Sequence, residues 1–357
     1  MNLSINIKRA LCFVSTLSLL LCVVFLYSYF IDKNKDITDA RNYFYFFTNV
    51  LEVGLIESTL INYVGGGKFE PVLLIFYKLY SFLHSSEVGF KGFYWFVFYN
   101  YVIITAFTLY LIRLYSECLA SSNKYAIIFI AFLLSFFWFP SYLNMLWVWR
   151  TNMAYSFVLL SLYFFLKKRM YVSIAFVVIA TLTHYSSFFL ILLIYFFYFL
   201  SFKYKRLSIG IKTVVTIILA LLSSFFYAYV KSIVSSGDAL WAGDYYLRYF
   251  ILFYFILGLL LFSIALPSLK PKVDYSSYSL IVALFLFFIF SIIVSMLGAS
   301  NYQDSFRIMH FSYLSFCLFF PIVLINSRIY VRIISFFYLF FGIASTLYLF
   351  FNFFKIQ

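Results

Sequence analysis

The residues of this chain that could take part in chemistry are ionisable side chains beside long apolar runs. Arg150 opens a run that carries no other charge until Lys167, and His184 separates two charge-free runs. Arg307 and His310 are three residues apart, so they would share one face of a helix. Ionisable groups in or beside membrane spans are costly and are usually functional. We therefore treat Arg150, His184, Arg307 and His310 as candidate site residues.

Each candidate suits phosphate or proton chemistry, and each also has a structural interpretation. At the start of a helix, the fork of donors on Arg150 and the free backbone N–H groups would together favour a phosphate. Arg150 could instead be an interfacial arginine among tryptophans. His184 suits proton transfer or a phosphate contact, or it is a buried histidine bonded to a backbone carbonyl. Arg307 could form an ion pair with Asp304 at the mouth of a span, and the two interpretations of Arg307 can coexist.

A second set of candidates could bind sugar hydroxyls or supply a base. Most of its members lie in a polar segment after the first apolar run, and the set comprises Asp39, Arg41, Tyr43, Glu70 and Arg248. Glu70 also has a structural alternative, because a residue that precedes a proline can cap a short helix.

Recognisable nucleotide and metal motifs are absent from the sequence. It contains no GxGxxG, P-loop, HExxH or nucleophile elbow. The four cysteines are Cys12, Cys22, Cys118 and Cys317, and none of them forms a CxxC or another metal-like spacing. We therefore predict that the protein uses no cofactor and no metal.

The elements that must position these residues are transmembrane helices. Of the 357 residues, 65% are apolar and only 11% are charged, whereas a soluble domain carries about 25% charged residues. The mean hydropathy is +1.00. This composition predicts an all-α polytopic integral membrane protein. The expected spans are the apolar runs 10–31, 92–112, 125–149, 151–166, 170–183, 185–202, 213–230, 249–269, 275–303, 308–327 and 333–354.

The net charge of +14 could suggest a nucleic-acid partner, but the positions of the basic residues argue against one. They gather in short clusters between apolar runs, which is the positive-inside pattern of a membrane protein. The inner clusters hold more than half of the 26 basic residues and only Glu117 and Asp274 of the 12 acidic ones. These clusters are Lys8 and Arg9, Arg113 with Lys124, Lys167 to Arg169, Lys203 to Lys212, Lys270 with Lys272, and Arg328 with Arg332.

The charge pattern also sets the direction of the spans. Segment 170–202 lies between two basic loops, is too long for one span and is short for two, so we predict a tight helical hairpin with His184 at its turn. Residues 32–91 form an outer segment that contains a short re-entrant or surface helix from Pro71 to Leu83 and an amphipathic helix within 42–63. The count is about 11 transmembrane helices, with a range of about 10 to 13, and the C-terminus lies outside. We expect residues 1–357 to form one membrane domain.

This topology gathers the arginines, the histidine and the carboxylates on the outer face. Arginines suit a diphosphate, tyrosines and tryptophans stack on sugar rings, and a cleft lined by phenylalanine suits a polyprenyl tail. The combination favours a lipid-diphosphate-linked sugar as the ligand.

The order of motifs resembles the EpsG/Wzy-type family of bacterial polysaccharide polymerases. In that family a DY-x-x-Y element, an E-P element, an R-Q-x-x-A-type helix start, an H-x-S element and a final arginine follow one another. The matching residues are Asp39 and Tyr43, Glu70-Pro71, Arg150-Thr151-Asn152-Met153-Ala154, His184-Tyr185-Ser186, and Arg307. Ala40 replaces the first tyrosine of the family pattern, and Thr151 stands where glutamine is frequent. The resemblance runs from about residue 36 to 320.

The resemblance implies a metal-independent integral membrane glycosyltransferase, similar to the GT-C type. Such an enzyme moves a growing glycan from undecaprenyl diphosphate to a lipid-linked repeat unit, on the periplasmic face of the bacterial inner membrane. Its partners would be undecaprenyl-diphosphate-linked oligosaccharide, membrane lipid and a chain-length regulator. In our mechanistic hypothesis Arg150 and Arg307 bind the diphosphate, and His184 contacts the diphosphate or assists the acceptor hydroxyl.

Three other functions fit the same sequence. A flippase or transporter of the lipid-linked oligosaccharide would often show internal repeats, and none is evident. A membrane O-acyltransferase acting on polysaccharide would also use a histidine, but we would expect it to face the cytoplasm. A membrane scaffold would not need charged groups at the ends of its helices.

Overall fold

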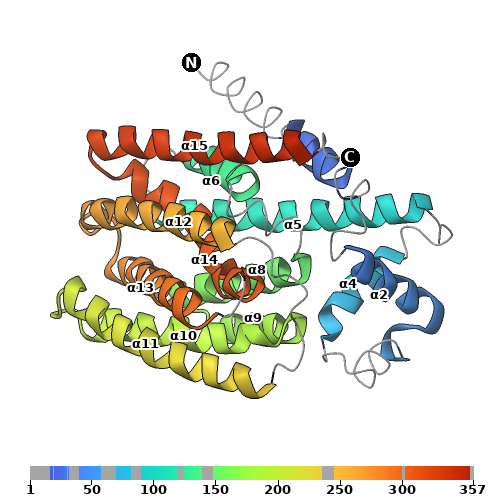
Figure 1. Cartoon of the computed structure of the whole chain (residues 1–357), viewed down its shortest axis with the longest axis horizontal. Coiled ribbons are helices and arrows are strands. Elements are labelled where there is room, and N and C mark those ends of the chain that lie inside the picture. The colour runs from blue at the N-terminus through green and yellow to red at the C-terminus, as the bar shows by residue number, and fades with distance from the viewer. Residues whose placement is uncertain are drawn as a thin grey trace. The chain divides into compact units, whose positions relative to one another are not determined.

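Every regular element that the computed structural model describes is a helix (Figure 1). The described residues are 17–18, 20–29, 31, 40–57, 70–81, 90–119, 124–138, 148–234, 245–299 and 302–353. The prediction of an all-α fold is therefore confirmed for this part of the chain.

Seven helices of the described residues are long and apolar enough to cross a membrane. The protein is therefore a multi-pass membrane protein. Each of these helices overlaps one of the predicted runs. They are α5 (Phe90–Leu119), α10 (Ser186–Lys203), α11 (Ile209–Val234), α12 (Tyr245–Ala265), α13 (Tyr275–Leu297), α14 (Tyr302–Ile325) and α15 (Ile329–Phe353).

The other predicted spans are helical where they are described, but they are shorter or more polar. They comprise residues 20–29, α6 (Lys124–Phe137), α8 (Trp149–Leu166) and α9 (Met170–Thr183). Helix α8 carries Arg150 and polar side chains such as Asn152 and Ser156, and both of these polar residues are buried. A helix enclosed by protein does not need an apolar surface toward lipid. The total of about 11 spans stays a prediction.

Helix α8 ends at a turn that includes a residue in the left-handed region. Lys168 has a φ of 59°. The N–H of Lys168 donates to the carbonyl of Phe165, and the N–H of Arg169 donates to the carbonyl of Phe164. This pair of bonds is the Schellman arrangement that closes a helix, and it allows α9 to begin at Met170.

The predicted break in segment 170–202 is present at His184. Helix α9 ends at Thr183 and α10 begins at Ser186. The N–H of His184 donates to the carbonyl of Ala180, and the carbonyl of His184 accepts from the N–H of Ser187. The break into two helices is therefore confirmed, and the depth of the turn in the bilayer stays a prediction.

The described residues of segment 32–91 contain the two predicted short helices. Helix α2 (Ala40–Val53) buries Tyr43, Phe47 and Val50, whereas Glu52 is exposed, so it is amphipathic as expected. Helix α4 (Pro71–Ser81) has 11 residues, which is too short to span a bilayer. Residues 58–63 of the predicted amphipathic stretch lie outside the described residues.

The contacts of the chain fall into two compact units. Unit 1 comprises residues 1–111, 144–161 and 171–187, and unit 2 comprises residues 112–143, 162–170 and 188–357. The expectation of one membrane domain over 1–357 stays a prediction.

Unit 1 has an aromatic core built around Phe96 of α5, which is fully buried. Its ring centroid lies 5.1 Å from that of Phe47 on α2, 5.1 Å from that of Tyr77 on α4 and 6.0 Å from that of Trp149 on α8. One phenylalanine therefore packs against three separate helices. Aromatic pairs of this kind contribute about 0.5–1.5 kcal/mol each beyond the burial of their area.

Unit 2 contains a reciprocal contact between α12 and α15. The rings of Tyr254 and Tyr338 stack with centroids 4.5 Å apart. The hydroxyl of Tyr338 donates to the carbonyl of Tyr254 over 3.2 Å, and the hydroxyl of Tyr254 donates to the carbonyl of Tyr338. Four residues after each tyrosine stands a glycine, Gly258 or Gly342, and a Cβ at either position would collide with the opposite tyrosine hydroxyl. The two helices thus approach through matching notches.

Candidate functional site

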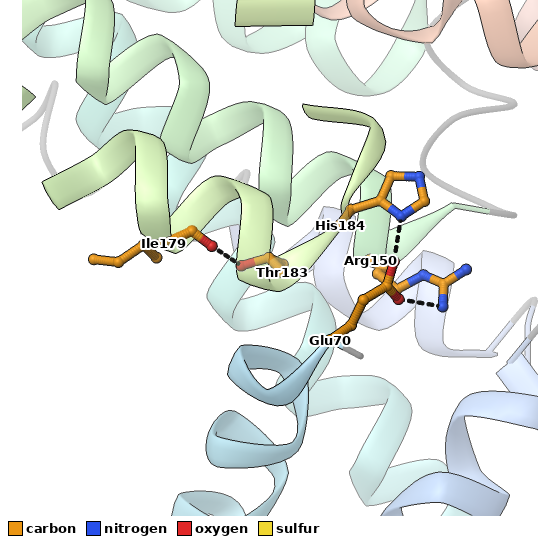
Figure 2. Close-up of polar contacts among 5 residues, drawn as sticks. All are labelled: Glu70, Arg150, Ile179, Thr183 and His184. Carbon is orange, nitrogen blue, oxygen red and sulfur yellow. Dashed lines mark hydrogen bonds and ion pairs between the residues drawn. The ribbon is translucent and has the colours of Figure 1, made fainter. Parts of the chain in front are cut away.

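Glu70, Arg150 and His184 form one hydrogen-bonded cluster in unit 1 (Figure 2). Nη1 of Arg150 donates to Oε2 of Glu70 over 2.6 Å. Nδ1 of His184 lies 2.8 Å from Oε1 of the same carboxylate. Both oxygens of Glu70 are therefore engaged, each by a residue from a different segment of the chain. The first distance is typical of a charge-assisted hydrogen bond.

The carboxylate of Glu70 is the most enclosed member of the cluster. Its side chain is 2% exposed, against 13% for His184 and 26% for Arg150. A buried carboxylate needs an opposite charge and hydrogen bonds to offset its lost hydration. Arg150 supplies the charge and His184 supplies a second contact. The cluster opens to its surroundings through the arginine and the histidine.

Glu70 is positioned by the start of α4. Pro71 is the first residue of the helix, where its fixed φ and missing N–H are tolerated. A carboxylate just before a helix is also favoured by the helix dipole. The sequence left open whether Glu70 only caps this helix. Its contacts to Arg150 and His184 show that it also joins two distant segments.

Arg150 is positioned by the first turn of α8. Its neighbour Trp149 is fully buried, stacks on Tyr43 with centroids 5.6 Å apart and donates from Nε1 to the hydroxyl of Tyr101 over 3.3 Å. This packing fixes the start of α8, where the backbone N–H of Asn152 donates to the carbonyl of Val148 over 2.9 Å. Nε of Arg150 is buried and has no hydrogen-bond partner among the described residues. Arg150 thus keeps donors that Glu70 does not use.

His184 is positioned by the turn between α9 and α10. Its backbone is bonded on both sides, to Ala180 and to Ser187. The hydroxyl of the preceding Thr183 donates to the carbonyl of Ile179 over 2.7 Å, which ties down the last turn of α9 (Figure 2). The imidazole then points at Glu70. Its partner is a carboxylate and not the backbone carbonyl that the structural interpretation of this histidine required.

The contact through Nδ1 determines what His184 can do. When Nδ1 carries the proton and donates it to Glu70, Nε2 has a free lone pair. A histidine oriented in this way by a carboxylate can accept a proton at Nε2. When both nitrogens are protonated, the ring becomes a cation held by Glu70. The cluster can therefore move a proton or bind an anion.

Tyr77 is a neighbour of the cluster that sequence reasoning did not select. Its side chain is buried, and its hydroxyl has no hydrogen-bond partner among the described residues. Burial raises the pKa of the Tyr77 phenol well above its usual value, and the Tyr43 phenol adds to this, whereas the positive charge of Arg150 opposes it. The hydroxyl therefore stays protonated at neutral pH and can act as a donor. One signal could have revealed it, because Tyr77 follows Glu70 by seven residues, or two helical turns.

The remaining candidates are not brought into the hydrogen-bonded cluster by any described contact. Tyr43 is buried in unit 1 against Trp149. Arg307 and His310 belong to α14 of unit 2, where Arg307 is exposed and His310 is buried, so the two side chains differ in accessibility although they lie one turn apart. Asp39 and the side chains of Arg41, Arg248 and Asp304 lie outside the described residues.

Trp149 corrects one expectation about sugar binding. Tryptophans were expected to stack on sugar rings by their apolar faces, but Trp149 is buried and packs against Tyr43, Phe96 and Tyr101. A better exposed aromatic ring beside the cluster is Tyr185, which is 46% exposed and has its centroid 5.5 Å from that of His184.

The donor atoms of the cluster suit anions and hydroxyls better than a metal ion. Within the described ranges, no group of three or more His, Cys, Asp or Glu side chains gathers as a metal site requires. The prediction that the protein uses no metal stays a prediction.

The fold and the cluster define the class of this protein as a multi-pass α-helical membrane protein with a buried Glu–Arg–His site. No known protein family, curated protein or solved structure matches the chain.

Proposed function

We propose that this protein is a polysaccharide repeat-unit polymerase. It transfers a growing glycan from undecaprenyl diphosphate to a lipid-linked repeat unit on the periplasmic face of the bacterial inner membrane. The observation that carries the proposal is the contact of Glu70 with both Arg150 and His184. Each of these residues belongs to a different motif of the resemblance to the EpsG/Wzy-type polymerases.

The convergence of three short motifs supports the resemblance. Glu70 comes from the E-P element, Arg150 from the helix start and His184 from the H-x-S element. In sequence, Glu70 lies 80 residues from Arg150 and 114 residues from His184. Short motifs that occurred by chance would have no reason to meet at one carboxylate. Their contact is what a shared active site requires.

In the proposed reaction, a hydroxyl of the acceptor sugar attacks the anomeric carbon of the donor glycan. A new carbon–oxygen bond forms, and the bond between that carbon and the diphosphate oxygen breaks. The electron pair of the broken bond leaves with undecaprenyl diphosphate. The hydroxyl proton passes to Nε2 of His184, while Glu70 holds Nδ1–H and stabilises the imidazolium that results.

Arg150 is the proposed contact for the departing diphosphate. It has donors that Glu70 does not use, and it stands in the first turn of α8, where backbone N–H groups favour an anion. Negative charge that grows on the leaving group is stabilised by donors already in place. Arg307 is proposed as a second phosphate contact, because its guanidinium is exposed at the start of α14.

Asp39, Arg41 and Arg248 are proposed to line the outer sugar site, and Tyr43 is proposed to support Arg150 through Trp149. The finer topology belongs to the same proposal. It comprises about 11 spans in a GT-C-like arrangement, with the basic loops in the cytoplasm.

A deletion strain tests the function directly. Loss of a polymerase leaves lipid A-core that carries a single repeat unit, whereas loss of a flippase leaves none. Loss of an O-acyltransferase leaves full-length ladders without acyl groups, and loss of a scaffold shortens no ladder. Any outcome other than single-repeat glycan overturns the proposal.

Complementation with arginine variants tests the site. Arg150→Ala and Arg307→Ala should leave single-repeat glycan at a protein level equal to that of the wild type. Arg113→Ala is the matched control, because Arg113 is an exposed arginine of unit 2 that pairs with Glu117 one helical turn away. It should restore the ladder. Normal ladders from both Arg150→Ala and Arg307→Ala would contradict the assigned roles.

A further inference from the structure

Three loops lie at the same end of unit 2 and carry much of its positive charge. They connect α10 to α11, α12 to α13 and α14 to α15, and Figure 1 draws all three at the left-hand end of their helices. Seven exposed basic side chains belong to these loops or to the adjoining helix ends, among them Lys272 and Arg332. We call the other five the basic rim. They are Lys203, Lys205, Arg206, Lys270 and Arg328.

Hydrogen bonds hold the first two loops together. Nζ of Lys212, at the start of α11, donates to the carbonyl of Ser201 over 3.1 Å. The hydroxyl of Tyr275, at the start of α13, donates to the same carbonyl over 2.9 Å. Ser201 lies in the last turn of α10. The carboxyl end of α10 is thus bonded by residues from two other helices.

The third loop is joined in the same way. Nζ of Lys272 donates to the carbonyl of Asn326 over 2.9 Å, and Asn326 directly follows α14. The carbonyl groups at the end of a helix carry partial negative charge, which normally disfavours a nearby anion. Lysines cover this charge at α10 and at α14. The positive charges of these lysines therefore offset the partial negative charge at the carboxyl ends of α10 and α14, next to the basic rim.

The basic rim keeps a surplus of positive charge. Within the described part of the chain, none of its five residues makes an ion pair. The charge of Lys270 acts on the buried Lys212, so two cations repel each other here. The nearby acidic residue is Asp274, whose carboxylate accepts from the backbone N–H of Ser277 as the cap of α13. An external anion would relieve the repulsion.

Exposed apolar side chains flank the basic rim. Tyr204, Ile211, Ile329 and Tyr330 are all exposed, and they lie on the same loops or on the first turns of α11 and α15. A small soluble anion would gain nothing from contact with these apolar side chains. A phospholipid would gain from both kinds of residue, because its phosphate can contact the basic groups while its acyl chains lie along the apolar ones.

We propose that the basic rim binds the headgroup phosphate of an anionic phospholipid, with Lys270 and Arg328 as the principal contacts. The lipid bridges the loop before α13 and the loop before α15, which Lys272 and Asn326 already join. Its site lies in unit 2 and does not depend on the chemistry of Glu70, Arg150 and His184 in unit 1.

The test uses the full-length protein in nanodiscs. The melting temperature is measured as phosphatidylglycerol replaces phosphatidylcholine at constant total lipid. The wild type should gain stability along a saturable curve, and the gain should shrink at high salt because exposed charges are screened. Lys270→Gln and Arg328→Gln should each weaken the apparent affinity about fivefold. Both variants should melt like the wild type in phosphatidylcholine alone, which shows that they fold.

Two controls separate this site from general charge effects. Arg113→Gln removes one positive charge from unit 2 outside the basic rim and should leave the phosphatidylglycerol curve unchanged. Soluble glycerol 3-phosphate should not replace the lipid, because it lacks acyl chains. An equal loss of affinity in Arg113→Gln, an unchanged curve in both rim variants, or full stabilisation by glycerol 3-phosphate would each overturn the proposal.

Discussion

Nδ1 of His184 and Oε1 of Glu70 lie 2.8 Å apart, although 114 residues separate them along the chain. The carboxylate is buried and the imidazole keeps part of its surface exposed. Glu70 therefore orients His184 from its enclosed side, and the rest of the ring keeps the small exposed surface of the side chain. In the proposed function the histidine is a positioned acid or base, and each member of the cluster then has its own testable role.

Substitution of His184 by glutamine should abolish the proposed polymerisation with little effect on folding. The glutamine amide can still donate to Glu70, but it cannot accept a proton in the reaction. Loss of a general base lowers a rate by about 10²–10⁴-fold. The measurements are the glycan ladder and the melting temperature of the purified protein. A His184→Gln protein that makes normal ladders at the wild-type level would remove His184 from the mechanism.

The pair of Glu70 and Arg150 should show strong energetic coupling. Glu70→Gln leaves the guanidinium without its counter-charge, and Arg150→Gln leaves the buried carboxylate with its contact to His184 but without the charge of Arg150. Breaking a fully buried pair costs about 3–5 kcal/mol, and we expect less here because Arg150 is 26% exposed. The double variant should be more stable than the sum of the two losses predicts. Additive changes in the free energy of unfolding would show that the two residues do not interact.

Tyr77→Phe should leave the stability of the fold almost unchanged and should lower the proposed activity. The hydroxyl has no partner among the described residues, so its removal should change the free energy of unfolding by less than about 1 kcal/mol. If the hydroxyl contacts the substrate, polymerisation should fall at the same time. Tyr80→Phe is a matched control, because Tyr80 is a buried tyrosine of the same helix. Equal activity of Tyr77→Phe and the wild type would show that Tyr77 has only a packing role.

The raised pKa of Tyr77 also predicts a dependence on alkaline pH. The phenol of the unfolded chain ionises near its usual pKa of about 10, whereas burial keeps the folded phenol neutral. Its contribution to stability is fully present below that pKa and is lost as the pH rises toward the folded value. The melting temperature of the wild type should therefore fall more than that of Tyr77→Phe between pH 8 and pH 11. Parallel curves for the two proteins would contradict this.

Gly342→Ala should destabilise unit 2, whereas Gly210→Ala should not. A Cβ at Gly342 would lie 2.6 Å from Cδ1 of Trp138 and would collide with the hydroxyl of Tyr254. Overpacking of this kind costs about 1–3 kcal/mol. At Gly210 the nearest atom is Oγ of Ser208 at 3.7 Å, which is ordinary contact, and alanine favours a helix. The check is the thermal midpoint of both variants in one detergent, and a similar midpoint for the two would contradict the close approach of α12 and α15.

The sequence patterns predicted where the helices lie along the chain, but they predicted less well which helices contact one another. Long apolar runs between basic loops were enough to locate the seven long helices, because each must satisfy its own backbone in a bilayer. The break at His184 followed from the length between two basic loops. The shortness of α4 followed from the number of crossings that the charges allow. In these cases the constraint is the length of an apolar run and the charge of the loops beside it, and both can be read from neighbouring residues of the chain.

The pairing of Glu70 with Arg150 and His184 could not be predicted in the same way. Each residue was selected individually, but nothing in the spacing shows which carboxylate meets which cation, since that depends on how α4, α8 and α9 pack. The burial of Trp149 was missed for a related reason, because a tryptophan beside an arginine suits a membrane interface and a protein core equally well.

The matching tyrosines and glycines of α12 and α15 have a mechanical consequence. Each helix supplies one tyrosine and one glycine. The hydroxyl of Tyr338 lies against Gly258 of α12, and the hydroxyl of Tyr254 lies against Gly342 of α15. Sliding one helix by a single turn, about 5.4 Å, would carry the Tyr338 hydroxyl from Gly258 onto a bulky residue such as Phe262, one turn beyond Gly258. We therefore expect any rearrangement of unit 2 to move α12 and α15 together, as one rigid pair.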